Sequence, residues 1–108
     1  MKILIADDHP INLKVLRATL EAEGHSIFQA EDGVEALEIL DCQPVDVIIS
    51  DILMPNMDGY RLCREIRSRP KFAATPIILY SSTYLAPGDR QLALDFGADA
   101  FGDLGRRG

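Results

Sequence analysis

A buried strand that ends in a carboxylate constrains this chain more than any other feature, and it lies in the segment 45–59 (VDVIISDILMPNMDG). The β-branched run from Val47 to Ile49 has no polar interruption, which is typical of a strand covered on both faces. Pro55 cannot donate to a sheet ladder, so the strand ends before it. The segment therefore places Asp51 at the carboxyl end of a buried strand, which is the edge of an open α/β sheet where ligands bind.

Strand-like and helix-like segments alternate along the rest of the chain. The expected strands are 2–6, 25–30, 45–50 and 77–80, with the start of a fifth at 98–101. Apolar residues at helical spacing follow each of the first four strands, and the segment 25–30 is mixed in the manner of an edge strand. This alternation predicts a doubly wound, flavodoxin-like parallel α/β sheet with strand order 2-1-3-4-5 and an incomplete fifth β/α unit.

Length, charge and cysteine usage narrow the class of protein. A chain of 108 residues is enough for one domain with one core. The net charge of −6 argues against a direct nucleic-acid surface, and no apolar run approaches the length of a membrane span. Cys42 and Cys63 have neither metal-ligand spacing nor nearby partners, which favours two reduced thiols in a cytoplasmic domain.

Three carboxylates, those of Asp7, Asp8 and Asp51, end the first and third expected strands. These strands are neighbours in the order 2-1-3-4-5, so the carboxylates should converge. Two such charges about 4 Å apart repel by roughly 4 kcal/mol at an effective dielectric near 20, so a cation or a bound proton must compensate them. Oxygen ligands with open positions suit Mg²⁺. Any one of the three carboxylates alone would favour a helix-capping or loop role, whereas the three together favour a metal-binding site.

Several neighbours of this cluster leave alternatives open. The Ser81 hydroxyl either reaches a group attached to Asp51 or is one of three solvated hydroxyls in SST. We interpret His9, beside the acidic pair, as a helix-entry residue at the mouth of the site rather than as a metal ligand. For Tyr80 and Tyr84, which flank the Ser/Thr cluster, a surface role and an apolar packing role are equally open.

Four segments in this order resemble a response-regulator receiver domain: IADD, SDILMPNMDG, YSST and GADAF at the first, third, fourth and fifth strands. The resemblance extends from Met1 to about Phe101, so we expect a receiver domain over residues 1–101 and an irregular tail over 102–108. The segments DDHPIN and YSSTYLAPGD are similar to receivers found within or beside hybrid sensor histidine kinases.

The resemblance implies a Mg²⁺-dependent phosphoacceptor that is phosphorylated by a histidine kinase or a histidine phosphotransfer domain. It implies that Asp51 is the phosphoacceptor, that Ser81 hydrogen-bonds the phosphoryl group, and that Phe101 is an aromatic switch that turns inward on activation. The metal would be bound by Asp8 directly and by Asp7 through water, and the implied metal site comprises Asp7, Asp8, Asp51 and the backbone carbonyl of Leu53.

The end of the chain departs from the family pattern. Receivers carry Lys-Pro after the fifth strand, whereas Leu104 and Gly105 occupy those positions here, and no lysine follows Lys71. A fifth helix is also missing. Either the chain is a degenerate receiver, or it is truncated and carries a foreign tail; the loss of periodicity after Phe101 favours truncation.

Loss of a fifth helix has a consequence for the sheet. In the receiver arrangement the first and fifth helices share one face, so strands such as 3–5 and 47–49 would keep a bare apolar strip. A patch of this kind is unusual on a soluble monomer. It predicts self-association as a homodimer, or else marked instability.

Two other functions remain as alternatives. A phosphate-independent pseudo-receiver, acting as a protein-interaction module, is supported by the missing lysine and opposed by the intact acids. An aspartyl-phosphate phosphatase of the haloacid-dehalogenase type needs DxD after the first strand, whereas this chain has DDH there. As a receiver, the chain would be no enzyme beyond assisting its own phosphoryl transfer and slow dephosphorylation, with an output or kinase domain attached.

Overall fold

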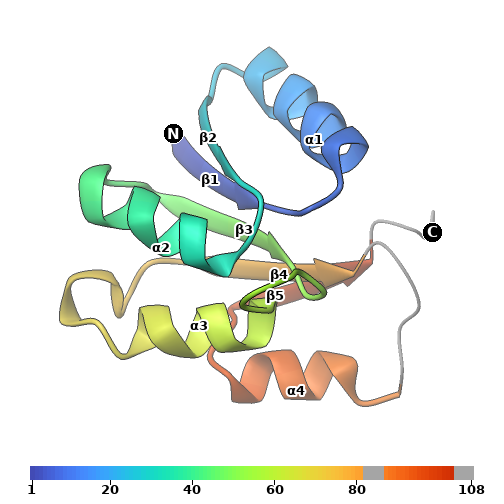
Figure 1. Cartoon of the computed structure of the whole chain (residues 1–108), viewed down its shortest axis with the longest axis vertical. Helices are drawn as coiled ribbons and strands as arrows, with labels where there is room; N and C mark the ends of the chain where they lie inside the picture. The colour runs from blue at the N-terminus through green and yellow to red at the C-terminus, as the bar shows by residue number, and fades with distance from the viewer. Residues whose placement is uncertain (82–86, 104–108) are drawn as a thin grey trace.

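Five parallel strands form one sheet in the order β2–β1–β3–β4–β5 (Figure 1). The computed structural model describes residues 1–81 and 87–103. The strands are β1 (Lys2–Ala6), β2 (Ser26–Ala30), β3 (Val47–Asp51), β4 (Ile77–Ser81) and β5 (Ala100–Asp103). The predicted doubly wound α/β sheet is confirmed, and β2 is an edge strand as expected.

Helices cover both faces of this sheet. They are α1 (Pro10–Ala22), α2 (Gly33–Cys42), α3 (Gly59–Arg67) and α4 (Asp89–Asp95), with a short 3₁₀ turn, η1 (Pro70–Phe72), in the predicted loop after α3. Figure 1 shows α1 on one side of the sheet and α2, α3 and α4 on the other. No helix in the described part of the chain combines the length and the apolar character that crossing a membrane requires.

The alternation of side chains along each strand creates two core regions. Leu4, Ile48 and Leu79 belong to the larger one, which packs beneath α2, α3 and α4. Ile3 and Ile5 point the other way and join a smaller region with Leu13 of α1, Ile27 of β2 and the partly buried Leu16 and Leu20. The apolar run of β1 is therefore explained by cover on both faces of that strand.

The face that carries α1 is only partly covered. Ile3 and Ile5 are buried under α1, so the expectation that they lie bare is wrong. Val47 and Ile49 of β3 and Ile78 of β4 keep intermediate exposure. The apolar strip is therefore narrower than predicted and is confined to the strands farther from α1. The self-association inferred from it stays a prediction.

The fifth strand begins and ends later than predicted. The Ala98 amide donates to the carbonyl of Ala93, so Ala98 closes the end of α4 instead of opening the strand. Gly102 and Asp103 then pair with Tyr80 and Ser81 of β4. A glycine is poor strand material by composition, but an exposed edge of β4 offers backbone partners that any residue can use. Leu104, which the resemblance aligns with a family lysine, lies outside the described residues.

One arginine joins the carboxyl end of α3 to three other segments. The Arg67 guanidinium donates through Nε to the Gly97 carbonyl at 2.9 Å and through an Nη to the Thr75 carbonyl at 2.7 Å. Its other Nη contacts the Asp99 carboxylate at 2.7 Å. The same Asp99 oxygen accepts from the Ile77 amide at 2.8 Å, at the start of β4. Arg67 therefore fixes the loop before β4 and the turn after α4 in one network.

We predict that Arg67→Lys lowers the free energy of unfolding by about 2 kcal/mol, because one ammonium cannot replace a guanidinium that bonds three groups in a fixed plane. Urea unfolding monitored by circular dichroism would measure the change. Arg69→Lys is the matched control, since Arg69 makes a partly exposed ion pair with Asp41 at 3.0 Å and should cost less than about 1 kcal/mol. Equal losses in the two variants would contradict a central role for Arg67.

Candidate functional site

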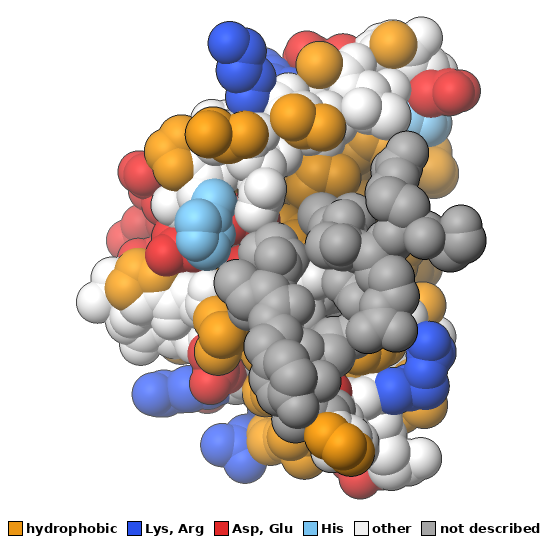
Figure 2. Space-filling view, turned by 90° about the vertical axis from the view of Figure 1, so that its right-hand side faces the viewer, with side chains coloured by type: hydrophobic (Ala, Val, Ile, Leu, Met, Phe, Trp, Pro, Cys, Tyr) orange, Lys and Arg blue, Asp and Glu red, His pale blue; other side chains and the backbone are white. Residues whose placement is uncertain are grey.

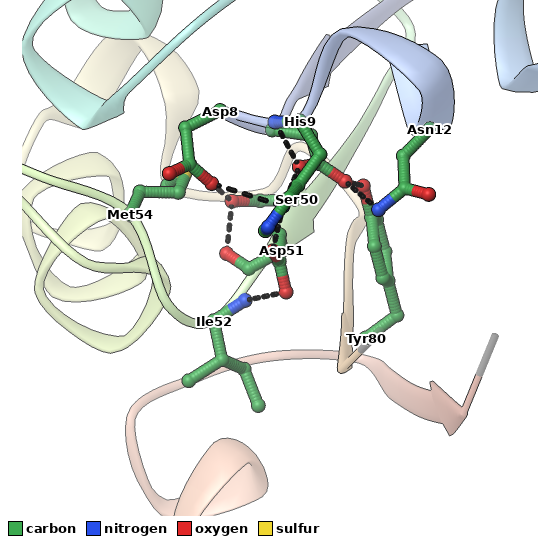
Figure 3. A network of polar contacts seen from close by, with 9 residues as sticks. Asp8, His9, Asn12, Ser50, Asp51, Ile52, Met54 and Tyr80 are labelled. Carbon is green, nitrogen blue, oxygen red and sulfur yellow. Dashed lines mark hydrogen bonds and ion pairs between the residues drawn. The ribbon is translucent and has the colours of Figure 1, made fainter. Parts of the chain in front are cut away.

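The carboxyl ends of β1 and β3 bring four potential ligand residues together. Ala6 pairs with Ser50, so the residues that follow β1 meet the last residue of β3. Ligand atoms of Asp7, Asp8, His9 and Asp51 all lie within 4.8 Å of one another (Figure 3). The predicted convergence of the three carboxylates is therefore present. Figure 2 views the molecule from this side, where a histidine and acidic side chains lie together at the surface.

Asp7 is buried, and hydrogen-bond donors engage both of its oxygens. Oδ1 accepts from the His9 backbone amide at 2.8 Å. Oδ2 accepts from the Asn12 side-chain amide at 3.1 Å and from the Tyr80 hydroxyl. Donors from α1 and β4 thus hold this carboxylate in one orientation. Asp7 is poorly placed to give up a lone pair to a metal, in line with the water-mediated role that the family resemblance implies.

Tyr80 is the functional residue that sequence reasoning missed. Its side chain is only 2% exposed, and its hydroxyl donates to Asp7 rather than facing a surface or filling an apolar space. Burial, followed by the bond to Asp7, raises the pKa of this phenol, so it remains a donor at neutral pH. The strand topology contained a signal that the Tyr80 side chain lies on the same side of the sheet as the carboxylate cluster. Tyr80 is the register partner of Asp51 in a parallel pair, which puts both side chains on one face.

Asp8 and Asp51 present the open oxygens of the cluster. Among the described residues, no hydrogen-bond donor satisfies the buried Oδ1 of Asp8. Asp51 accepts from the Ile52 amide through Oδ1 at 2.8 Å, while its Oδ2 lies 3.9 Å from His9 Nδ1. Burial first, and then the charge of Asp7, raise the pKa of Asp51 to about 6. At neutral pH this carboxylate is mainly ionised and poorly compensated.

The loop that carries Asp51 into α3 is held by close backbone packing. A Cβ on Gly59 would lie 2.4 Å from the Asp51 carbonyl oxygen, so only glycine fits there. The Gly59 amide donates to the Ile52 carbonyl at 2.8 Å. Asn56, with φ of 67°, donates through its side chain to Asp32, which caps α2, at 2.7 Å. The position of Asp51 is therefore set by both neighbouring helices.

The remaining predicted site residues lie around this centre. Leu53 follows Asp51 by two positions, and its side chain is 59% exposed. Ser81 is buried at the end of β4, one residue after the register partner of Asp51. Phe101 on β5 is already buried in the larger core, with the Arg90 guanidinium 5.9 Å from its ring centre. The roles assigned to these three residues stay predictions.

The donor set fits Mg²⁺. Carboxylate oxygens are the hard ligands that this ion prefers, and it keeps several waters when only one or two carboxylates bind it. Asp8 Oδ1 has no donor among the residues described, and it lies in the same cluster as the open side of Asp51. An ion that neutralises both charges would remove the unfavourable contact between them.

Comparison with known proteins agrees with this geometry. The family model described as "Response regulator receiver domain" matches residues 3–101. A gliding motility regulatory protein of Myxococcus xanthus is 39% identical over 97% of this chain and 14% of that protein. The sensor histidine kinase RcsC of Escherichia coli is 41% identical over 93% of this chain and 10% of that protein. This chain therefore spans only a small part of the length of the curated relatives it matches.

A solved structure is similar over nearly the whole chain. It is the receiver domain of a sensor histidine kinase from Pseudomonas aeruginosa, described as having a magnesium ion coordinated in its active site cleft. It is 31% identical to this chain, with a TM-score of 0.86, and the match covers 98% of this chain and 86% of that one. Sequence and structure thus identify the same family.

Because the pKa of Asp51 is raised from 3.8 to about 6, the folded state binds its proton more tightly than the unfolded state does. Ionised Asp51 therefore lowers stability at neutral pH, and this cost fades as the pH falls from about 6 towards 4. We predict that Asp51→Asn raises the free energy of unfolding by about 1–3 kcal/mol at neutral pH in the absence of metal, from roughly 1.4 kcal/mol per pKa unit.

Urea unfolding in the presence of a chelator, repeated across this pH range, would measure the gain. Asp7→Asn is the matched control, because an amide nitrogen there would face the donors that now hold Asp7. That variant should be less stable than the wild type. A gain for Asp51→Asn that does not change with pH would contradict its electrostatic origin.

We also predict that Tyr80→Phe lowers the free energy of unfolding by about 1–3 kcal/mol, since a buried carboxylate loses one of its donors. Tyr60→Phe removes a hydroxyl that donates to Asp89 at 3.1 Å in a less buried place, and it should cost under about 1 kcal/mol. Thermal and chemical unfolding of the two variants would test the difference. If Tyr80→Phe is neutral, Asp7 does not depend on this bond.

Proposed function

Since the chain belongs to the response regulator receiver family, we propose that Asp51 accepts a phosphoryl group from a phosphohistidine while Mg²⁺ is bound by Asp8 and Asp51. The chain is a receiver domain of two-component signal transduction. The observation that carries the assignment to Asp51 is its unequal surroundings: one oxygen is fixed by the Ile52 amide, and the other faces the cluster without a hydrogen-bond donor among the described residues.

The protein groups divide the work of phosphoryl transfer. An Asp51 oxygen attacks phosphorus, the new O–P bond forms, the N–P bond of the phosphohistidine breaks, and the imidazole leaves with its electron pair and takes up a proton. When bound, Mg²⁺ neutralises charge on the transferring oxygens. The Ile52 amide orients the attacking carboxylate, and the donors on Asp7 keep that side chain in a position from which it would bind the metal through water. The Leu53 carbonyl would complete the protein ligands.

Phosphorylation of Asp51 would change the conformation of the neighbouring strands and of α4. A phosphoryl group adds about −1.5 to −2 charges by analogy with other phosphorylated side chains. Ser81, at the end of the neighbouring strand, would donate its hydroxyl to a phosphoryl oxygen and move with it. Phe101, which is buried in this structure, would act as the aromatic switch. Repacking of α4 and β5 would then change the surface that a partner meets.

We also propose a phosphoryl donor, a cellular compartment and an attached domain for this receiver. Relatives that are sensor histidine kinases support a histidine kinase or a histidine phosphotransfer domain as the phosphoryl donor. The receiver would comprise residues 1–101, lie in the cytoplasm, be attached to an output or kinase domain, and have no enzymatic activity beyond its own phosphorylation and dephosphorylation.

A pseudo-receiver is the second candidate, and one observation favours it. Leu104 stands where the family has lysine, and no lysine follows Lys71. In that case the domain would bind a partner without using phosphate. The membership in the receiver family leaves the phosphatase alternative without support.

We predict that incubation with acetyl phosphate and Mg²⁺ adds the mass of one phosphoryl group, and that Asp51→Asn abolishes the addition. Intact-mass spectrometry would detect the product, and omission of Mg²⁺ should prevent it. Asp58→Asn is the matched control, because Asp58 caps α3 and accepts from the Arg61 amide at 2.8 Å outside the cluster. Labelling that persists in Asp51→Asn would refute the assignment, and no labelling of the wild type would favour the pseudo-receiver.

A further inference from the structure

The ring of His9 lies inside the carboxylate cluster. Its Nδ1 atom is 3.1 Å from Asp7 Oδ1, 3.2 Å from Asp8 Oδ1 and 3.9 Å from Asp51 Oδ2 (Figure 3). One nitrogen thus contacts an oxygen from each of the three carboxylates. His9 is the residue that precedes the first turn of α1, as the sequence predicted, but its side chain makes no capping bond to that helix.

The 3.1 Å contact with Asp7 is a hydrogen bond, whereas the separations of 3.2 Å from Asp8 and 3.9 Å from Asp51 match those of atoms that share one metal ion. With metal–ligand bonds of about 2.1 Å, neighbouring ligand atoms lie about 3 Å apart and opposite ones about 4 Å apart. The backbone amide of His9 is fixed on Asp7, so the ring is anchored at its base. The side chain is 50% exposed, which leaves the ring room to adjust. The unsatisfied Oδ1 of Asp8 is the oxygen next to this nitrogen.

We propose that His9 Nδ1 is a metal ligand, so that this receiver prefers divalent late first-row transition ions, from Fe²⁺ to Zn²⁺, over Mg²⁺ by more than its carboxylates alone would give. The inference rests on the proposed metal-dependent site and adds a nitrogen to its oxygen donors. Imidazole suits these borderline ions, whereas Mg²⁺ demands oxygen ligands. His9 then does more than begin a helix: it sets which class of cation the acidic cluster selects.

The test compares two ions and two histidines in the full chain. Carboxylates alone bind Ni²⁺ more tightly than Mg²⁺, so the informative quantity is the ratio of the two dissociation constants in each variant. His9→Phe keeps a flat ring without nitrogen. We expect it to weaken Ni²⁺ binding by about 10-fold or more, the range seen when a group supporting a metal is removed, and to leave Mg²⁺ binding nearly unchanged.

A control variant and a spectrum distinguish binding by His9 from binding elsewhere on the chain. His25→Phe removes the other histidine, whose Nδ1 lies 3.0 Å from the terminal amine of Met1. Because an amine and an imidazole this close could bind Ni²⁺ themselves, the terminal amine is acetylated in every variant. His25→Phe should then keep the wild-type ratio of the Ni²⁺ and Mg²⁺ dissociation constants. Bound Co²⁺ should give a visible absorption band that shifts in His9→Phe. In the Co²⁺ form of the wild type, the ring-proton signals of a coordinated His9 should show large contact shifts, whereas a ring that is only close to the ion would be broadened without them.

The outcomes separate this inference from the proposed function. Equal weakening of Ni²⁺ and Mg²⁺ in His9→Phe, or a Co²⁺ spectrum that does not change, would overturn the role of His9 as a ligand. A loss of Ni²⁺ binding that follows His25 would overturn it as well. Labelling of the wild type with acetyl phosphate and Mg²⁺ is measured separately, so its failure would count against the proposed function and not against the role of His9 as a ligand.

Discussion

Repulsion among three carboxylates at the ends of β1 and β3 is the constraint on which the rest of this structure depends. Their oxygens lie within 4.8 Å of one another, and two of the three side chains are almost fully buried. Like charges at such separation are tolerated only where donors, protons or cations compensate them. The molecule compensates them unequally. Asp7 receives donors on both oxygens, whereas Asp8 and Asp51 each keep an oxygen without one among the described residues.

This inequality gives the cluster its chemistry. A carboxylate that is held by Asn12, Tyr80 and a backbone amide is a fixed support. A carboxylate that lacks donors is free to act as a ligand or a nucleophile when a positive partner binds. The close approach of Gly59 to the Asp51 carbonyl and the hydrogen bond from its amide to the Ile52 carbonyl tie the loop that carries Asp51 to the start of α3. The fold therefore holds unfavourable electrostatic repulsion at this cluster. Together with burial, this repulsion raises the pKa of Asp51 to about 6.

The sequence predicted those features that local patterns control. Strand order and the meeting of Asp7, Asp8 and Asp51 followed from apolar runs, turn residues and the rule that carboxyl ends of parallel strands share one edge. The network of Arg67 and the bond from Tyr80 to Asp7, 73 residues away, were not predicted. Both depend on where long side chains reach in the folded state, which periodicity does not encode. The late end of β5 was missed because pairing with β4, rather than composition, decides it.

The source of positive charge at this site follows from the same contacts. In the described part of the chain, the hydrogen bonds to Asp7 and Asp51 come from backbone amides, the Asn12 amide and the Tyr80 phenol, and His9 is the basic side chain that lies against both carboxylates. Neutral donors orient a carboxylate but do not cancel its charge. The resemblance aligns Leu104 with the position that supplies a lysine in the family. A phosphoryl group would add further negative charge to the cluster. If Mg²⁺ or another cation binds here, it would supply more of the compensation than it would beside a lysine, and a nitrogen ligand that strengthens its binding would matter more for the same reason.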